Sequence, residues 1–260
     1  MSFDLSGAGV VITGGGGGIG AALARRFTAE GARVVLSDLN GDAVTAVAEE
    51  VGGLAIVGDA ASESGVEQVI GAAKDALGTI DLYCANAGVA YLGGEDSPED
   101  EWARAWDVNV MAHVRAAKLL LPDWLARGRG HFLATVSAAG LLTTLGAAPY
   151  SVTKHGALAF AEWLSATYRH RGITVQAVCP QGVRTRMLAD TGPAGELIMG
   201  AGAIEPAQVA DEVREALLDE RFLILPHPEV ADYYAARATG TDRWLTAMNK
   251  LQRKVEALGD

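Results

Sequence analysis

The sequence is poor in basic residues and in cysteine. Its 260 residues include 21 Lys and Arg against 32 Asp and Glu, for a formal net charge of −11. This balance argues against nucleic acid or an anionic membrane as a partner. An anionic cofactor can still bind, because backbone amides at a helix N-terminus supply local positive potential. The two cysteines, Cys84 and Cys179, lie in apolar stretches without metal or redox spacing, so we expect buried free thiols.

Long apolar runs are absent as well. No segment is long enough to span a bilayer, and the N-terminus lacks a charged stretch followed by an apolar run and a cleavage site. The five histidines are scattered without ligand spacing, so we predict no metal site. These features predict a cytoplasmic protein that binds neither nucleic acid nor membrane.

Short apolar segments alternate along the chain with amphipathic ones. The predicted strands are Gly9–Thr13, Arg33–Ser37, Leu54–Val57, Ile80–Cys84, His131–Val136, Thr174–Cys179 and Phe222–Leu225. The predicted helices are Ala21–Glu30, Asp42–Val51, Ser64–Ala76 with a Ser64–Glu67 capping box, Ser97 or slightly later to about Arg127, Tyr150–Arg171 and Pro206–Leu218. This rhythm predicts an α/β fold, a Rossmann-type doubly wound parallel β-sheet flanked by helices. No linker divides the chain, so we expect a single domain over 1–260.

A glycine run lies between the first predicted strand and the first predicted helix. Residues 13–20 read Thr-Gly-Gly-Gly-Gly-Gly-Ile-Gly. A loop at this place brings backbone N–H groups close to a pyrophosphate, and glycine is required where a Cβ would block the approach. The alternative is a flexible turn. Asp38, at the end of the second strand, favours the first interpretation, because an acid there suits the ribose hydroxyls of NAD and repels the 2′-phosphate of NADP. Helix capping by Asp38 is compatible with that role.

Tyr150 and Lys154 are four residues apart, which places both on one face of a helix. A nearby ammonium favours the phenolate and lowers the tyrosine pKa, so the pair can do acid–base work on an alcohol. Ser137 ends a strand, where its hydroxyl can reach a substrate oxygen. Taken singly, these residues are equally compatible with a turn serine, a surface aromatic and a solvated charge.

Together with the glycine loop, these residues resemble the short-chain dehydrogenase/reductase family in its short, NAD-preferring form. The resemblance runs from the first strand to about Leu225. The matching segments are Thr13-Gly14 through Gly18-Ile19-Gly20, Ala85-Asn86-Ala87-Gly88, Asn109, Ser137, Tyr150, Lys154 and Pro180-Gln181-Gly182-Val183-Arg184-Thr185.

The resemblance implies a role for each matched residue. Tyr150 would exchange the substrate proton, Ser137 would orient the carbonyl, Lys154 would lower the tyrosine pKa and hold the nicotinamide ribose, and Asn109 would position a proton-relaying water. The implied NAD-binding residues are Gly14, Gly18, Ile19, Gly20, Asp38, Asp59, Ala60, Asn86, Ala87, Gly88, Tyr150, Lys154, Pro180, Val183 and Thr185. The cofactor carries the hydride chemistry. The resemblance also implies a homotetramer or homodimer.

Two positions depart from the family pattern, with Ala85 in place of an asparagine and Gln181 in place of a glycine. We expect Gln181 to narrow or polarise the substrate pocket. The other predicted substrate residues are Ser137, Tyr91, Leu141 and Met187, within a set that also holds Leu142, Leu188, Leu197, Ile198 and Met199. Most are apolar, which predicts an apolar cyclic, aryl or medium-chain substrate. Alternatively, several of them pack as core or close over the cofactor.

Residues 186–205 are expected to form a substrate lid, and 228–260 a C-terminal helical extension. Trp244, Met248, Leu251, Val255 and Leu258 recur at spacings of four and three, which predicts one apolar stripe on a helix that packs on this domain or on another subunit. The predicted activity is therefore NAD-dependent interconversion of a secondary alcohol and a ketone. The alternatives are a 3-oxoacyl-thioester reductase, against which Asp38 argues, and a non-catalytic cofactor-binding regulator, against which the complete catalytic set argues.

Overall fold

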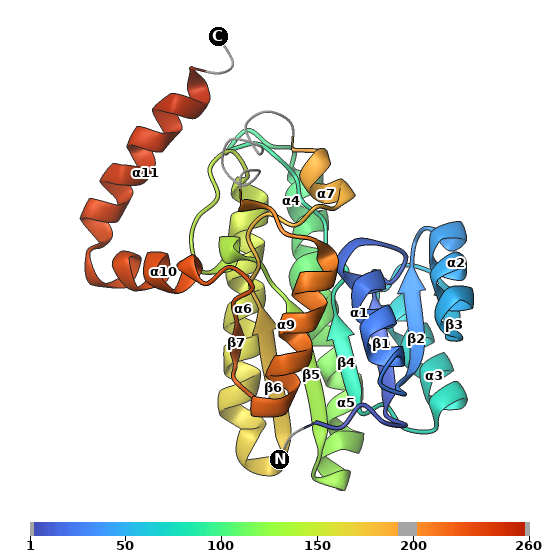
Figure 1. Ribbon diagram of the computed structural model, residues 1–260. Helices are drawn as coiled ribbons and strands as arrows, with labels where there is room; N and C mark the ends of the chain where they lie inside the picture. The colour runs from blue at the N-terminus through green and yellow to red at the C-terminus, as the bar shows by residue number, and fades with distance from the viewer. Residues whose placement is uncertain (1–2, 192–201, 258–260) are drawn as a thin grey trace.

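The chain forms a single α/β domain around a seven-stranded parallel sheet (Figure 1). The computed structural model describes residues 3–191 and 202–257. The strand order is β3-β2-β1-β4-β5-β6-β7. The strands are β1 (Gly9–Thr13), β2 (Arg33–Asp38), β3 (Leu54–Val57), β4 (Leu82–Ala85), β5 (Gly130–Thr135), β6 (Ile173–Val178) and β7 (Leu223–Ile224). The order reverses between β1 and β4, and in such sheets the ligand crevice lies at that switch point.

Helices cover both faces of the sheet, as the sequence predicts. They are α1 (Gly18–Thr28), α2 (Gly41–Val51), α3 (Glu63–Leu77), α4 (Glu99–Trp106), α5 (Ala112–Arg127), α6 (Ala148–Tyr168), α7 (Arg186–Ala189), α9 (Pro206–Asp219), α10 (Glu229–Thr239) and α11 (Thr241–Glu256). Two apolar cores result. Val11 packs in the core with α3, α5 and α6, whereas its neighbours Val10 and Ile12 pack in the core with α1, α2 and α9. Alternate residues of a strand point to opposite faces, so a strand covered on both sides is apolar throughout.

The helix boundaries differ from the prediction at two places. The capping residue of α3 is Ser62, whose hydroxyl accepts a hydrogen bond from the Gly65 N–H, so the predicted Ser64–Glu67 box is wrong and Ser64 lies exposed inside the helix. The long helix ending at Arg127 is interrupted by one π-helical turn, η1 (Asp107–Met111). Such π turns occur frequently at functional sites.

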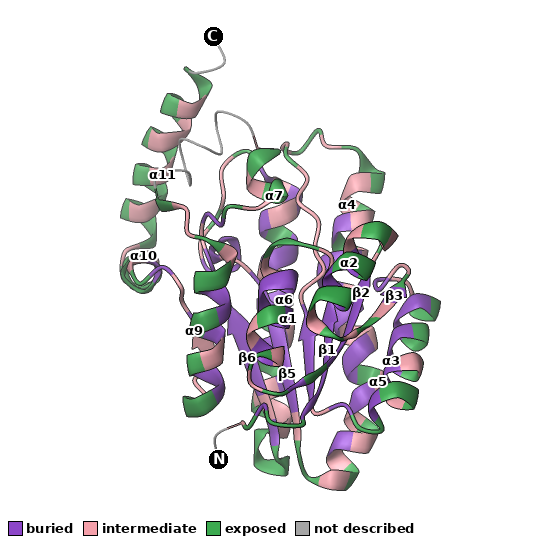
Figure 2. Cartoon of the chain, turned by 45° about the vertical axis from the view of Figure 1, so that its right-hand side comes forward, coloured by how far each residue is buried: buried purple, intermediate pink, exposed green. Residues whose placement is uncertain are grey.

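The C-terminal extension is helical, and Figure 2 shows α11 projecting from the rest of the domain. No residue of α11 is buried, and the four described members of its apolar stripe, Trp244, Met248, Leu251 and Val255, are half-buried. The fifth, Leu258, lies outside the described residues. The Arg237 guanidinium of α10 lies 5.4 Å from the Trp244 ring centroid, donates to the Leu141 carbonyl and contacts His155 Nε2 at 2.9 Å. Across the described parts of the chain, no helix is long and apolar enough to cross a membrane.

Candidate active site

The carboxyl ends of the strands gather most of the predicted site residues at one edge of the sheet. The glycine loop follows β1, Asp38 ends β2, Asp59 and Ala60 follow β3, and Asn86 follows β4. Ser137 comes after β5, and the segment from Pro180 to Thr185 after β6. Helix α6 brings Tyr150 and Lys154 to the same place, and η1 brings Asn109. A parallel sheet delivers all of these loops to one crevice because every strand points the same way.

Within the glycine loop, backbone segments lie so close together that a side chain would not fit between them. A Cβ on Gly20 would lie 2.1 Å from the Gly14 oxygen, and Gly14 itself has φ +66°. The N-terminus of α1, where Gly17 is the capping position, has no side-chain cap and no acidic residue in its first turn. Its uncapped N–H groups and its dipole therefore favour an anion such as a pyrophosphate.

Asp38 is held against this loop by two backbone hydrogen bonds. Its Oδ2 accepts from the Gly16 N–H and its Oδ1 from the Asn40 N–H, both at 3.0 Å. A Cβ on Gly16 would lie 3.0 Å from Asp38 Oδ2, so glycine lets the acid approach the loop. The helix-capping alternative falls to Asn40 instead, whose side chain accepts from the Ala43 N–H at the start of α2. Asp38 is thus fixed at the sheet edge, as a ribose-binding acid requires.

Asn86 joins three strands beneath the crevice. Its amide nitrogen donates to the Thr13 carbonyl at 2.9 Å, and its amide oxygen accepts from the Thr135 hydroxyl at 3.0 Å. The Thr13 hydroxyl in turn accepts the backbone N–H groups of Asn86 and Ala87, both at 3.0 Å. Sequence analysis assigned no site role to Thr13 or Thr135. Thr13 begins the glycine motif, which is a signal, but nothing local marks Thr135, since its partner is 49 residues away.

Asn109 occupies the middle of the π turn and is fully buried. Its side-chain oxygen accepts from the Val89 N–H, and its nitrogen donates to the Val89 carbonyl and to the Thr153 hydroxyl, each at 3.0 Å. It thereby ties the loop after β4 to α6. A Cβ on Gly88 would lie 3.2 Å from Asn109 Oδ1 and 3.4 Å from Lys154 Nζ, so Gly88 sits directly against both side chains. Thr153 is another residue that the sequence analysis missed.

Ser137, Tyr150 and Lys154 converge as predicted. The Ser137 hydroxyl lies close enough to Tyr150 to lower the tyrosine pKa; it accepts from the Ala139 N–H at 3.1 Å and donates to the Pro180 carbonyl at 3.4 Å. Lys154 is 3% exposed; its Nζ lies 5.7 Å from the Tyr150 ring centroid and donates to the Thr135 carbonyl at 2.9 Å. A hydroxyl pair above a buried ammonium can bind an alcohol oxygen and exchange its proton.

The ionisation of this group differs from the expectation in one respect. Desolvation raises the pKa of Tyr150, and the hydrogen bond with Ser137 offsets only part of that rise. Burial also lowers the pKa of Lys154 to about 8. The expected lowering of the tyrosine pKa is therefore wrong, because desolvation is the largest contribution to that pKa. Burial raises the pKa of the neighbouring Cys179 thiol to about 12 and also raises the pKa of Cys84; both are free and buried, as predicted.

Asp59 is engaged on both oxygens. Desolvation pushes its pKa up, but the Arg104 guanidinium at 3.0 Å and the Ala61 N–H at 3.0 Å hold the pKa below its ordinary value. Ala60 beside it is buried. The adenine contact expected of Asp59 stays a prediction, and Arg104 and the Ala61 N–H are partners that the sequence did not indicate.

The segment after β6 closes the crevice on its other side. Val183 is buried, and the Thr185 methyl group lies 3.1 Å from where a Gly18 Cβ would be, so this segment meets the glycine loop. The backbone N–H of Gln181 donates to His227 Nδ1 at 3.1 Å. His227 lies just beyond β7, and sequence analysis gave it no role.

The predicted substrate residues have different environments. Tyr91 and Gln181 are half-buried and Met187 is 39% exposed, so all three keep accessible surface that a substrate can contact. Leu141 is 1% exposed and belongs to the core cluster, which agrees with the alternative that some of these residues pack as core. Leu197, Ile198 and Met199 lie outside the described residues.

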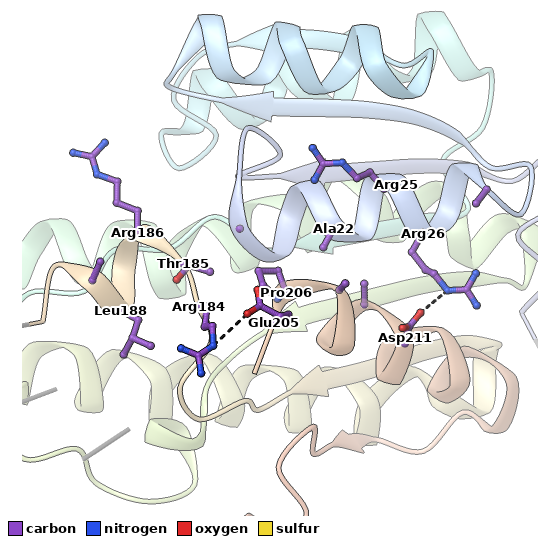
Figure 3. Close-up of a pocket in the computed structure, with 15 residues that line it drawn as sticks. Ala22, Arg25, Arg26, Arg184, Thr185, Arg186, Leu188, Glu205, Pro206 and Asp211 are labelled. Atoms are coloured by element: carbon purple, nitrogen blue, oxygen red, sulfur yellow. Dashed lines mark ion pairs between the residues drawn. The ribbon is translucent and has the colours of Figure 1, made fainter. Parts of the chain in front are cut away.

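A cleft of about 1250 Å³ lies on the outer side of the glycine helix, between α1, α7 and α9 (Figure 3). Thr185 lines it, but the catalytic side chains do not. Four arginines reach it, and each has a carboxylate partner: Arg25 with Glu50, Arg26 with Asp211, Arg184 with Glu205 and Arg186 with Asp190. The cleft therefore carries little unpaired positive charge, as expected for arginines exposed at a surface.

This fold and this site define a dinucleotide-binding oxidoreductase of the α/β class. Residues 8–195 match the family model described as short chain dehydrogenase. The chain therefore belongs to the short-chain dehydrogenase/reductase family, whose members act on CH–OH groups.

Relatives and solved structures agree with this assignment. The chain is 35% identical over 229 residues to a 1-deoxy-11-beta-hydroxypentalenate dehydrogenase of Streptomyces exfoliatus, covering 84% of this chain and 82% of the relative. It is 33% identical over 202 residues to a 2,5-dichloro-2,5-cyclohexadiene-1,4-diol dehydrogenase of Sphingobium indicum, covering 74% and 80%. A short-chain dehydrogenase/reductase of Burkholderia phymatum, solved in complex with NAD, superposes with a TM-score of 0.85 at 25% identity, covering 92% of this chain and 96% of that one.

Proposed function

We propose that this protein is an NAD-dependent oxidoreductase that interconverts a secondary alcohol and a ketone, on an apolar cyclic, aryl or medium-chain substrate. One observation carries the proposal: Tyr150 lies beside Ser137, whose hydroxyl lowers the tyrosine pKa, while the buried Lys154 ammonium lies 5.7 Å from the tyrosine ring centroid. This arrangement supports a proton acceptor and an oxyanion partner acting together on the substrate oxygen.

The residues present suit a nicotinamide dinucleotide. The uncapped N-terminus of α1 accepts the pyrophosphate, and the crowding around Gly14 and Gly20 keeps that approach free of side chains. Asp38 accepts the adenosine ribose hydroxyls and repels a 2′-phosphate, which supports NAD over NADP. When bound, the nicotinamide supplies the hydride acceptor or donor.

The chain's own residues then handle the alcohol proton. Ser137 holds the substrate oxygen, Tyr150 takes its proton during oxidation, and Lys154 stabilises the resulting phenolate. Asn109 fixes the loop that includes Gly88 against the ammonium, so that the lysine remains aligned. The apolar side chains at the expected pocket and the ring diol named for the Sphingobium relative support the substrate class.

The test begins with cofactor titration. We expect NADH to bind the purified protein more tightly than NADPH, and cyclic or aryl secondary alcohols with NAD to yield reduced cofactor. Tyr150→Phe should lower kcat by at least about 10²-fold, the range for one acid–base group. Tyr168→Phe, at the far end of the same helix, is the matched control. NADH binding without turnover of any alcohol or ketone, including 3-oxoacyl thioesters, would favour a non-catalytic, regulatory role.

Self-association is part of the proposal. Trp106, Val152 and Trp163 are 45%, 49% and 55% exposed on α4 and α6, and large apolar side chains on neighbouring helices favour contact with a second copy. We expect a homodimer or homotetramer by light scattering, and Trp163→Glu should reduce the measured mass. An unchanged wild-type monomer mass would contradict this part.

A further inference from the structure

His227 lies where the β6–β7 ladder ends. The Ala177 N–H donates to the Phe222 carbonyl at 2.8 Å, and the Cys179 N–H donates to the Ile224 carbonyl at 2.9 Å. The next donor in this series is the Gln181 N–H. It donates at 3.1 Å to the imidazole Nδ1 of His227. The His227 side chain thus accepts the hydrogen bond that follows the last backbone hydrogen bond between β6 and β7.

The opposite ring nitrogen holds a second segment. His227 Nε2 lies 3.1 Å from the Gly202 carbonyl. Because a carbonyl only accepts and a backbone N–H only donates, this pair of partners requires the neutral tautomer with its hydrogen on Nε2. The imidazole itself is 3% exposed, and both of its bonds are partly buried. Pro226 and Pro228 flank His227 and restrict the backbone on both sides of it.

The two segments joined by His227 also meet each other. The Arg184 N–H donates to the Ile204 carbonyl at 2.9 Å, and the Ile204 N–H donates to the Gly182 carbonyl at 3.1 Å. These two hydrogen bonds hold the segment that follows Gln181 against the segment that follows Gly202. His227 is the side chain that bonds to both ends.

The Gln181 end leads directly to the catalytic hydroxyl. Pro180, the preceding residue, accepts the Ala138 N–H at 2.8 Å and the Ser137 hydroxyl at 3.4 Å through its carbonyl. Ser137 in turn lies beside Tyr150 and lowers the tyrosine pKa. A shift of the Gln181 backbone therefore moves the acceptor that orients Ser137.

We propose that His227 is a positioning residue for the reaction: its Nε2–H tautomer fixes Gln181 and Gly202 and, through Pro180, keeps the Ser137 hydroxyl aligned with Tyr150. The catalytic part of this inference rests on the proposed alcohol–ketone activity. The hydrogen-bonding part stands on the geometry alone, so the two can fail separately.

Three variants separate the two hydrogen bonds. His227→Asn retains an acceptor near the Nδ1 position and loses the donor to Gly202. His227→Gln retains a donor near the Nε2 position and loses the acceptor for Gln181, and His227→Phe loses both. His170→Phe, at an exposed histidine of the 3₁₀ turn after α6, is the control for replacing an imidazole.

The first readout is amide hydrogen exchange at Gln181, which needs no substrate. We expect faster exchange in His227→Gln and His227→Phe, with protection retained in His227→Asn and in the control. The second readout is kcat with the best alcohol at saturating NAD. We expect about a tenfold fall in His227→Gln, the order of one lost buried hydrogen bond at a reacting group, and a smaller fall in His227→Asn.

Each result decides a separate statement. Unchanged Gln181 exchange in both His227→Gln and His227→Phe would overturn the inference. Faster exchange with unchanged kcat would also overturn it, because the bond would then be structural only. If wild-type protein oxidises no alcohol, the proposed function fails while the exchange data still test the bonds. If His227→Phe does not fold, the contrast between Asn and Gln carries the test.

Discussion

Two buried histidines should make this protein sensitive to acid. His113, at the start of α5, is 1% exposed, and neither ring nitrogen has a hydrogen-bond partner among the described residues; the ring lies edge-on to Phe132 at 6.0 Å. His131, in β5, is 2% exposed and lies 2.8 Å from the Gln176 side-chain oxygen. Burial, with a smaller contribution from Lys154, lowers the pKa of His113 to about 3, and burial lowers the pKa of His131 to about 4.

These shifts set the sign and size of the effect. Both pKa values lie below the unfolded value of 6.5, so the unfolded chain binds protons first as the pH falls. Stability is fully present above pH ~6.5 and is lost as the pH falls toward the folded-state pKa values. At pH 5 each histidine costs about 2 kcal/mol, since the unfolded imidazole is then ~97% protonated while the folded one is neutral. The pair removes roughly 4 kcal/mol, a large share of a typical folding free energy.

Urea unfolding at pH 7.5 and pH 5 measures this loss. We expect His113→Leu to retain the free energy of unfolding at pH 7.5, because it removes two buried nitrogens that have no partner, and to recover about 2 kcal/mol of the acid loss. His170→Gln, at an exposed histidine, should behave as wild type. If His113→Leu and wild type lose the same free energy between the two pH values, the assignment of a buried neutral imidazole is refuted.

Three further outcomes follow from the site. Asp38→Asn should tighten NADPH binding about tenfold, because it removes a charge that repels the 2′-phosphate. The control Asp42→Asn, at an exposed residue, should leave NADPH binding unchanged. Equal effects of the two variants in NADPH titration would contradict the role of Asp38. Gln181→Gly should alter the ratio of kcat/KM between a small and a bulky alcohol. An unchanged ratio would contradict the expectation that Gln181 lines the substrate pocket. Deleting residues 241–260 should lower the mass in solution by more than the mass of the deleted residues, because a subunit contact is lost. A fall equal to the mass of the deleted residues alone would count against a subunit contact by α11.

The fold was largely readable from the sequence because parallel strands covered on both faces leave uninterrupted apolar runs. The segment around Val10 to Ile12 is an example: three successive residues are fully buried, in two different cores. The positions of Ser137, Tyr150 and Lys154 were predictable as well, because their spacing and the strand order bring them to one edge of the sheet.

Features that depend on contacts between distant residues were not readable. The Thr135–Asn86 bond spans 49 positions, and the His227 bond to Gln181 spans 46. The sequence analysis also did not anticipate the π turn at Asn109. The direction of the Tyr150 pKa depends on burial that the Tyr–Lys spacing does not encode.

The burial of both native cysteines has a practical consequence. The raised thiol pKa values keep Cys84 and Cys179 protonated at neutral pH, and neither side chain is accessible to reagents. The enzyme should therefore keep its activity without added reductant and resist maleimides. A cysteine introduced on the exposed face of α11, for example Lys250→Cys, would be the single reactive thiol of the chain. A spectroscopic probe attached there would report the placement of this helix, in solution, against a background free of native label.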